Sequence, residues 1–155
     1  MGIKAKFSLN DIKNEMMAFR SRVDKVILLN LQRLGEMAVI HARNRTGEES
    51  WFDQTGNLRS SIGYVIGKDG YVLGEGGFSR VLNGAQGCSE GEQYARELAH
   101  ELAGKYFLIV VAGMNYASYV EEMDNKDVLA SSELFVRNEL PKMKKRIDTM
   151  LKSIK

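Results

Sequence analysis

The chain has 155 residues, the size of one domain with its own hydrophobic core, so we expect a single domain over residues 1–155. A composition of 44% hydrophobic and 27% charged residues excludes a disordered or fibrous protein. The formal net charge of +2 is too small for a dedicated nucleic-acid binder, and the single cysteine, Cys88, excludes an intrachain disulfide and a thiolate zinc cluster.

The sequence also predicts a cytoplasmic protein without a membrane partner. Residues 1–10 have no apolar core of signal-peptide length. No stretch of the chain approaches the ~20 consecutive apolar residues that a helix needs to cross a bilayer.

The segment from Leu9 to Arg43 predicts one long amphipathic helix. No proline interrupts it and its only glycine is Gly35, so at 1.5 Å per residue the helix can reach about 50 Å. We expect its apolar stripe to lie across a sheet or against a neighbouring subunit. The stripe has alternating spacings of four and three and consists of Ile12, Met16, Phe19, Val23, Ile27, Leu31, Leu34 and Ala38.

The polar residues 44–54 predict a loop that Trp51 and Phe52 hold in place. Thr55 is a favoured N-cap residue, so we expect it to cap the short helical turn that follows. Gly56 gives the backbone room to turn at this point.

Two strands joined by a tight turn follow. Residues 62–67 alternate between large apolar and smaller side chains, and a second run occupies 71–73. Asp69 and Gly70 between them are typical of a β-hairpin turn. Lys105–Ala112 is the most apolar run of the chain, which predicts a central strand covered on both faces.

Residues 75–91 are rich in glycine and predict a mobile loop, and Glu92–Ala103 predicts a short amphipathic helix. We interpret 76–104 as an insertion. Ala130–Lys155 predicts a last helix, which Pro141 either kinks or restarts. The elements together predict an α+β fold, with the long N-terminal and the C-terminal helix packed on a small, mainly antiparallel sheet of three or four strands.

Few residues could support catalysis. His41 continues the apolar stripe of the long helix, which is typical of a histidine at the end of a core. His100 and Glu101 begin like a zinc-protease helix, but Gly104 stands where the second histidine belongs. Cys88 with His100 as its base would make a cysteine hydrolase, yet a flexible glycine-rich segment offers no preorganised oxyanion donors. We therefore expect no catalytic residue, metal site or cofactor.

The last helix is basic. Such a run is typical of a solvated helix face, and the alternatives are contact with an acidic partner or with nucleic acid. The basic residues are Lys142, Lys144, Lys145, Arg146, Lys152 and Lys155.

Two segments carry a family resemblance: DQTGNLRSSI at 53–62 and AGMNYASYVEEMDNKDVL at 112–129. They resemble the tail-completion or neck family of lambda-like siphophages and prophages, which has a T-G-N-L-R-x-S-I element before the first strand and a Y-A-x-x-V-E element after a later one. The chain departs from the family after Glu121, where a glycine and a threonine are missing, and at 132–135, where SELF replaces an Arg-Pro-Phe-Leu-like start. The matching residues are Thr55, Gly56, Asn57, Leu58, Arg59, Ser61, Ile62, Tyr116, Ala117, Val120 and Glu121.

The resemblance implies a non-enzymatic structural subunit at the head-tail junction or the head-proximal end of the tail. It would act as a ring of copies, with phage connector and tail proteins as partners, first in the host cytoplasm and then in the virion. A small adaptor that binds nucleic acid through the basic last helix is the alternative. We expect most motif residues to serve the fold: Arg59 pairs with Glu121 or another carboxylate, while Tyr116, Tyr119 and Val120 pack against the long helix.

Overall fold

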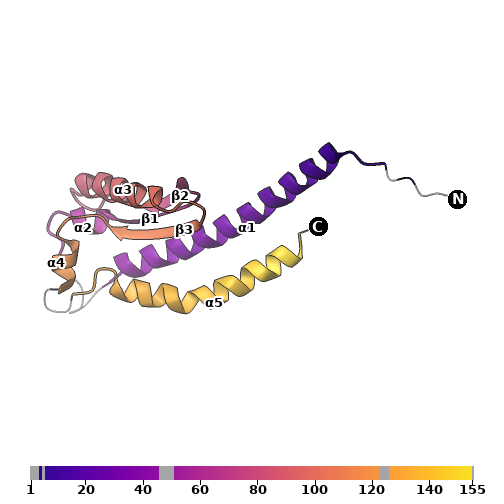
Figure 1. Ribbon diagram of the computed structural model, residues 1–155. Coiled ribbons are helices and arrows are strands. Elements are labelled where there is room, and N and C mark those ends of the chain that lie inside the picture. Colours follow the sequence, from indigo (N-terminus) through magenta and orange to yellow (C-terminus); the bar gives the residue numbers. More distant parts are fainter. Residues whose placement is uncertain (1–3, 5, 46–50, 123–125, 155) are drawn as a thin grey trace.

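A computed structural model describes residues 4, 6–45, 51–122 and 126–154. The fold is α+β, as the sequence predicts, with a small antiparallel sheet between helices (Figure 1). Its elements are α1 (Leu9–Arg43), α2 (Asn57–Ser60), β1 (Ile62–Lys68), β2 (Tyr71–Gly77), α3 (Ala85–His100), β3 (Tyr106–Ala112), α4 (Ala117–Glu122) and α5 (Ala130–Lys152).

The sheet has the strand order β2-β1-β3, and both neighbouring pairs are antiparallel. The turn between β1 and β2 places Asp69 (φ 57°) and Gly70 (φ 83°) in the left-handed region. Two successive residues with positive φ match the twist of a two-residue hairpin, which is why Asp-Gly is favoured there. The predicted hairpin is confirmed.

The prediction for the third strand is partly wrong. β3 forms where the sequence predicts it, but β1 is the central strand and β3 lies at an edge. The side chains of β1 are buried almost throughout, whereas most of those of β3 are half-buried. Helices α1 and α3 contact both faces of β3, so its sequence reads as continuously apolar although its outer edge has no neighbouring strand.

The glycine-rich region is ordered, which corrects the prediction of a long mobile loop. β2 extends to Gly77, and α3 begins at Ala85 rather than at Glu92. A Cβ on Gly87 would lie 2.0 Å from the carbonyl oxygen of Asn57, so this glycine lets α3 pack directly on another backbone. The small residues Ala95 and Ala99 then bury α3 against the sheet. Our interpretation of 76–104 as an insertion into the family fold stays a prediction.

Tyr64 of β1 fixes where α1 crosses the sheet. Its ring is fully buried, and its hydroxyl donates to Oε1 of Glu36 at 2.7 Å. A Cβ on Gly35 would lie 2.5 Å from the ring, and a Cβ on Gly76 of β2 would lie 2.6 Å from it. The single glycine of α1 therefore stands where the helix axis approaches an aromatic ring.

A polar cluster holds α1 at the point where it leaves the sheet. Lys68 Nζ lies 3.0 Å from Asp24 Oδ1, and the Tyr106 hydroxyl donates to the same carboxylate. The Lys68 ammonium also lies 4.8 Å from the Tyr106 ring centroid, so the three side chains form one unit. The cluster joins α1 to the ends of β1 and β3.

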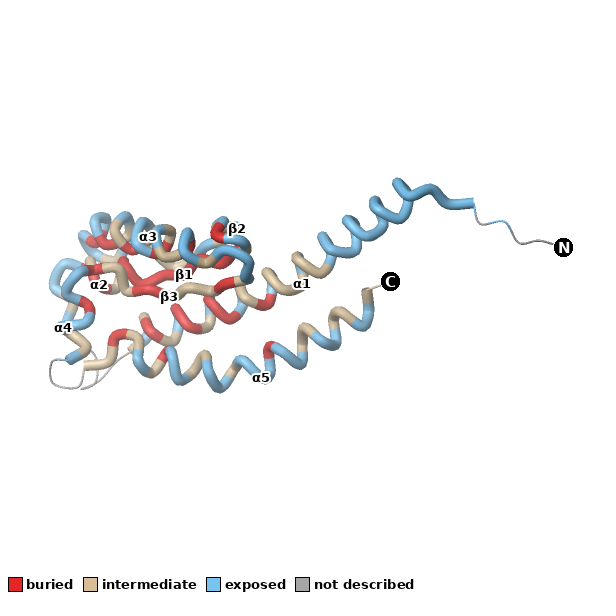
Figure 2. Tube along the Cα trace, in the orientation of Figure 1, coloured by how far each residue is buried: buried red, intermediate tan, exposed pale blue. Residues whose placement is uncertain are grey.

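The two long helices run side by side. α1 forms over Leu9–Arg43 as predicted, and α5 packs along it. α5 continues through the exposed Pro141, so the helix does not restart there, and Figure 1 shows it as one curved helix. Figure 2 shows that the N-terminal part of α1 extends beyond the body of the domain with all of its residues exposed.

Candidate functional site

The fold brings the two motif segments together at one end of the sheet. Leu58 and Ile62 of the first segment share a hydrophobic core with Ala117 of the second. The backbone N–H of Gly113 donates to the carbonyl oxygen of Ser61 at 3.2 Å. We call residues 53–62 and 113–121 the motif junction.

Asp53, which the sequence did not single out, organises the turn into α2. Its Oδ1 accepts from the Gly56 N–H and its Oδ2 from the Arg59 N–H, both at 2.8 Å. The predicted N-cap at Thr55 is therefore wrong. Thr55 accepts a longer bond of 3.2 Å from Asn57, and the cap position is taken by Gly56. A charged carboxylate is the stronger acceptor for exposed helix N–H groups, which explains the exchange.

Gly56 and Asn57 connect the turn to α3. Gly56 has φ 80°, and a Cβ there would lie 1.9 Å from the carbonyl oxygen of Val81, so only glycine fits. Asn57 Oδ1 accepts from the N–H of Gly87, in the first turn of α3, at 3.2 Å. The residue before that helix, Gly84, has no side chain with which to cap it. Asn57 therefore supplies the cap from a distant part of the chain.

Arg59 holds the end of α1. Its guanidinium donates to the carbonyl oxygens of Arg43 and Arg45 and lies 4.9 Å from the centroid of the Trp51 ring. A cation at a helix C-terminus satisfies carbonyl groups that the helix leaves open and complements the helix dipole. Glu121, one of the partners predicted for Arg59, is used at another helix end, and the pairing of Arg59 with another carboxylate stays a prediction.

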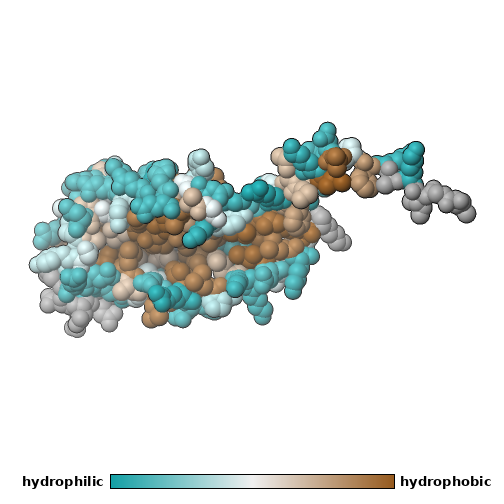
Figure 3. Space-filling model, in the orientation of Figure 1, coloured by the Kyte–Doolittle hydropathy of each residue, from teal (hydrophilic) through white to brown (hydrophobic). Residues whose placement is uncertain are grey.

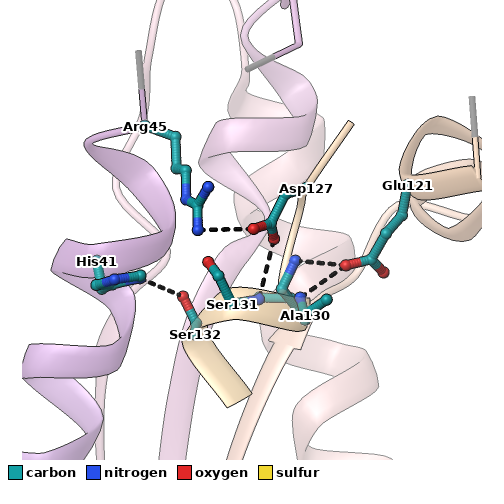
Figure 4. A network of polar contacts seen from close by, with 8 residues as sticks. His41, Arg45, Glu121, Asp127, Ala130, Ser131 and Ser132 are labelled. Atoms are coloured by element: carbon teal, nitrogen blue, oxygen red, sulfur yellow. Dashed lines mark hydrogen bonds and ion pairs between the residues drawn. The ribbon is translucent and has the colours of Figure 1, made fainter. Parts of the chain in front are cut away.

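Glu121 caps α5. Figure 4 shows the Glu121 side chain extending from α4 to the start of α5. Its Oε1 accepts hydrogen bonds from the N–H of Ala130 at 2.7 Å and from the N–H of Leu129 at 2.9 Å. Leu129 occupies the N-cap position and offers no acceptor of its own. A carboxylate there satisfies two open N–H groups and lies at the positive end of the helix dipole.

Asp127 ties the same end of α5 to the end of α1. Its Oδ1 accepts from the Ser131 N–H at 3.1 Å, and its Oδ2 lies 2.6 Å from Arg45 (Figure 4). Both charged side chains are less than a fifth exposed, so solvent screens this pair less than a surface pair. The ends of α1 and α5 are therefore fixed to each other by charge as well as by packing.

His41 belongs to the interface between the two helices. Its Nδ1 lies 3.2 Å from Ser132 Oγ, and its ring stacks on Phe135 with 4.9 Å between centroids. The expected placement of His41 at the edge of the core is confirmed. It has a packing role and is positioned by α5.

The tyrosines of the second segment lie mostly at the surface. Burial, followed by the negative charge of Asp53, raises the pKa of Tyr116, whose side chain lines a hollow together with Thr55 and Leu58. Tyr116 thus packs on the turn and not on α1. Tyr119 is exposed, so its predicted packing on α1 is wrong, whereas Val120 does contact the core cluster that includes α1.

The hydrolase alternative fails on geometry. Cys88 and His100 lie twelve residues apart on α3, which separates them by about 18 Å along the helix. Across the described residues, no group of three or more His, Cys, Asp or Glu side chains is arranged to hold a metal ion. The polar groups of the motif junction are used to cap helices.

A second surface feature lies outside the motif junction. Residues 6–22, which we call the α1 arm, carry the first half of the apolar stripe without burying it. Ile12, Met16 and Phe19 are 39%, 68% and 49% exposed, whereas Leu34, further along the same stripe, is 1% exposed. Figure 3 shows this apolar patch on the arm and a broad apolar band across the body over β3, between α3 and α5.

No model of a protein family matches the chain, and neither a curated protein nor a solved structure matches it. None of the helices in the described part of the chain is long and apolar enough to span a membrane.

Proposed function

We propose that the chain is a non-enzymatic structural subunit of a tailed bacteriophage or prophage, added at the head-tail junction or at the end of the tail. The observation that carries the proposal is the α1 arm. Monomeric proteins rarely keep a contiguous row of large apolar side chains in water, and such a row marks an interaction surface. The stripe keeps its spacing where α1 leaves the body, which suits a helix made to meet a partner.

The chemistry of the motif junction supports a structural role. The motif residues that resemble the phage family cap α3, hold the end of α1 and cap α5. The residues that carry the resemblance are helix caps and core side chains, so they maintain the fold. This is expected of a protein whose function is to present its folded surface to neighbouring subunits. The partners that the resemblance implies are connector and tail proteins and further copies of this chain.

A nucleic-acid-binding adaptor is the second candidate, because two basic elements extend to the same end of the molecule (Figure 1). Residues 142–154 of the C-terminal segment hold five basic side chains against one acidic, Asp148. The α1 arm, at the same end of the molecule, has four basic and two acidic side chains. This alternative predicts DNA binding that weakens steeply with salt, because each phosphate contact releases counterions.

The test is co-assembly. The chain is co-expressed with connector and tail proteins of the phage or prophage that encodes it, and the particles are purified and imaged by negative stain. Stoichiometric recovery of the chain with connector or tail ends is expected. Recovery in neither fraction, together with salt-sensitive DNA binding by the purified chain, would replace the structural proposal by the adaptor.

A matched variant makes the result specific. Met16→Lys and Phe19→Lys place charges in the arm stripe, at positions exposed in the subunit, so the fold should be unaffected. The control, Asn14→Lys, adds a charge on the opposite side of the same helix. We expect the stripe variant alone to be lost from the particles.

A further inference from the structure

We propose that the α1 arm of one copy docks in a groove along the open edge of β3 in a second copy of this chain. The inference deepens the proposed function, on which it rests, by naming the partner of the arm. The contact joins two different surfaces of the same protein, so it repeats head to tail and either closes into a ring or continues as a filament.

The groove lies beside the unpaired edge of β3. Its cavity has a volume of about 590 Å³, and Tyr94 and Leu98 of α3 form one side of it. Val110 and Ala112 of β3 form the apolar floor, and Leu129 closes the far side. A neighbouring hollow of about 420 Å³ shares Val110 and Leu129 and extends towards α5.

An open strand edge invites pairing with other chains, and natural proteins often cover such an edge with a helix. No element in the described part of this chain pairs with the outer edge of β3. The broad apolar band in Figure 3 crosses this face. A helix with one apolar side is therefore a fitting cover for the groove.

The wall that α3 contributes is acidic. Glu90, Glu97 and Glu101 are spaced by seven and four residues from one another, so they share a helix face with Tyr94 and Leu98. Tyr94 and Leu98 line the groove together with Val110 of β3, which places this face on the β3 side of α3.

Arg96, the only arginine of α3, which has no lysine, turns the other way. Arg96 forms ion pairs with Glu92 and with Glu75 of β2, on the opposite side of the helix. No positive charge of α3 therefore neutralises the groove wall.

The arm carries the complementary charge. Lys13, Arg20 and Arg22 flank its apolar stripe, and Glu15 is the only acidic side chain among the residues that line the stripe's own shallow hollow. An apolar row bordered by basic side chains thus matches an apolar groove bordered by acidic ones, and such complementarity fixes partner and register. Pairing of two arms would instead bring like charges together.

The arm cannot reach the groove of its own subunit. Figure 1 shows the arm at one end of the molecule and α4, whose residues Ala117, Ser118 and Glu121 line the groove, at the other. The partner is therefore a second copy, which presents the same groove.

Site-specific cross-linking tests the contact in the full chain. In a Cys88→Ser background, Met16→Cys on the arm and Tyr94→Cys in the groove are prepared as separate single-cysteine proteins, both at exposed positions. They are treated with a short bismaleimide alone and as a mixture. We expect a covalent dimer from the mixture and none from either protein alone, while Asn14→Cys on the far side of the arm gives none with Tyr94→Cys.

Each other pattern overturns the proposal. A dimer from Met16→Cys alone would show that arms pair with arms. A dimer from Tyr94→Cys alone would show that grooves face each other, and absence of any dimer would show that the arm has a different partner. Because the cross-link reports only contact between copies, it can succeed where co-purification with connector and tail proteins fails, so the two proposals fail separately.

A charge exchange provides a second, independent measurement. Glu97→Lys with Glu101→Lys in the groove should weaken self-association roughly tenfold by light scattering, since one exposed ion pair contributes up to a factor of about five. Adding Lys13→Glu and Arg20→Glu to the arm should restore it. If the two arm substitutions do not restore the self-association that the two groove substitutions weaken, the arm does not contact this wall.

Discussion

Gly35 gives a sharp test of how α1 packs on the sheet. In an ordinary helix, replacing an interior glycine by alanine stabilises the protein by about 1 kcal/mol, because alanine loses less backbone freedom on folding. In this fold the new methyl group would lie 2.5 Å from Cδ2, 2.6 Å from Cγ and 2.9 Å from Cε2 of the buried Tyr64 ring. The helix-propensity gain and the steric clash change the free energy of unfolding in opposite directions, so the sign of the measured change shows which of the two is larger.

The ring has little room to move away. A Cβ on Gly76 would lie 2.6 Å from Tyr64 Cε1, so β2 already contacts the ring, and Glu36 holds its hydroxyl at 2.7 Å. Overpacking a close-packed core costs about 1–3 kcal/mol. After subtracting the helix-propensity gain of about 1 kcal/mol, we expect Gly35→Ala to destabilise the domain by up to about 2 kcal/mol.

The assay is thermal and urea unfolding of the wild type, Gly35→Ala, Tyr64→Leu and the double variant. A loss of about 2 kcal/mol, the upper end of this range, corresponds to a melting temperature lower by about 4–8 °C for a domain of this size. In the Tyr64→Leu background the ring is gone, so the alanine should become neutral or stabilising. If Gly35→Ala raises the melting temperature of the wild type, the proposed contact between α1 and Tyr64 is wrong.

Three further predictions concern the polar contacts of the fold. Glu121→Ala should lower the free energy of unfolding by about 1–2 kcal/mol because α5 loses its cap, and Glu121→Gln should lower it less; equal losses in urea unfolding would contradict a role for the charge. The hydrogen bond from Tyr106 lowers the pKa of Asp24 in the folded protein. The ionised Asp24 carboxylate therefore stabilises the fold fully above the unfolded pKa of about 3.9, and this stabilisation is lost as the pH falls through the lower folded pKa. The difference in urea midpoint between wild type and Asp24→Asn should therefore shrink below about pH 4, and a constant difference would refute this linkage. Arg59→Lys should cost about 1–2 kcal/mol and change the fluorescence of Trp51, since lysine lacks the planar fork that reaches two carbonyls while stacking on a ring; a variant as stable as wild type would mean that positive charge alone suffices.

The regular elements could be predicted from the sequence because each depends on local spacing. The stripe of α1 repeats at three and four residues over its whole length, and Asp69-Gly70 selects a hairpin whatever surrounds it. The glycines of residues 76–91 misled the prediction because glycine marks flexibility in one context and close approach in another. Gly87 is required for packing on Asn57, and only the assembled fold distinguishes the two cases.

The motif junction shows the same division. The sequence identified Arg59 and Glu121 as important, and electrostatics suggested that Arg59 pairs with Glu121 or another carboxylate. The structure places them at two different helix ends, because open carbonyl and N–H groups at those ends compete for the same charges. Asp53 escaped notice because a carboxylate in a polar loop carries no periodic signal.

By itself the sequence determined the α+β class, the bounds of α1, the hairpin and the apolar stripe, since these follow from backbone preferences and from the spacing of apolar side chains. It could not determine which strand is central, which helix end each charge caps, or how much of the stripe is buried. Those features depend on contacts between residues far apart in the chain, and only the tertiary structure shows that α1 continues past the body with its apolar side exposed to water.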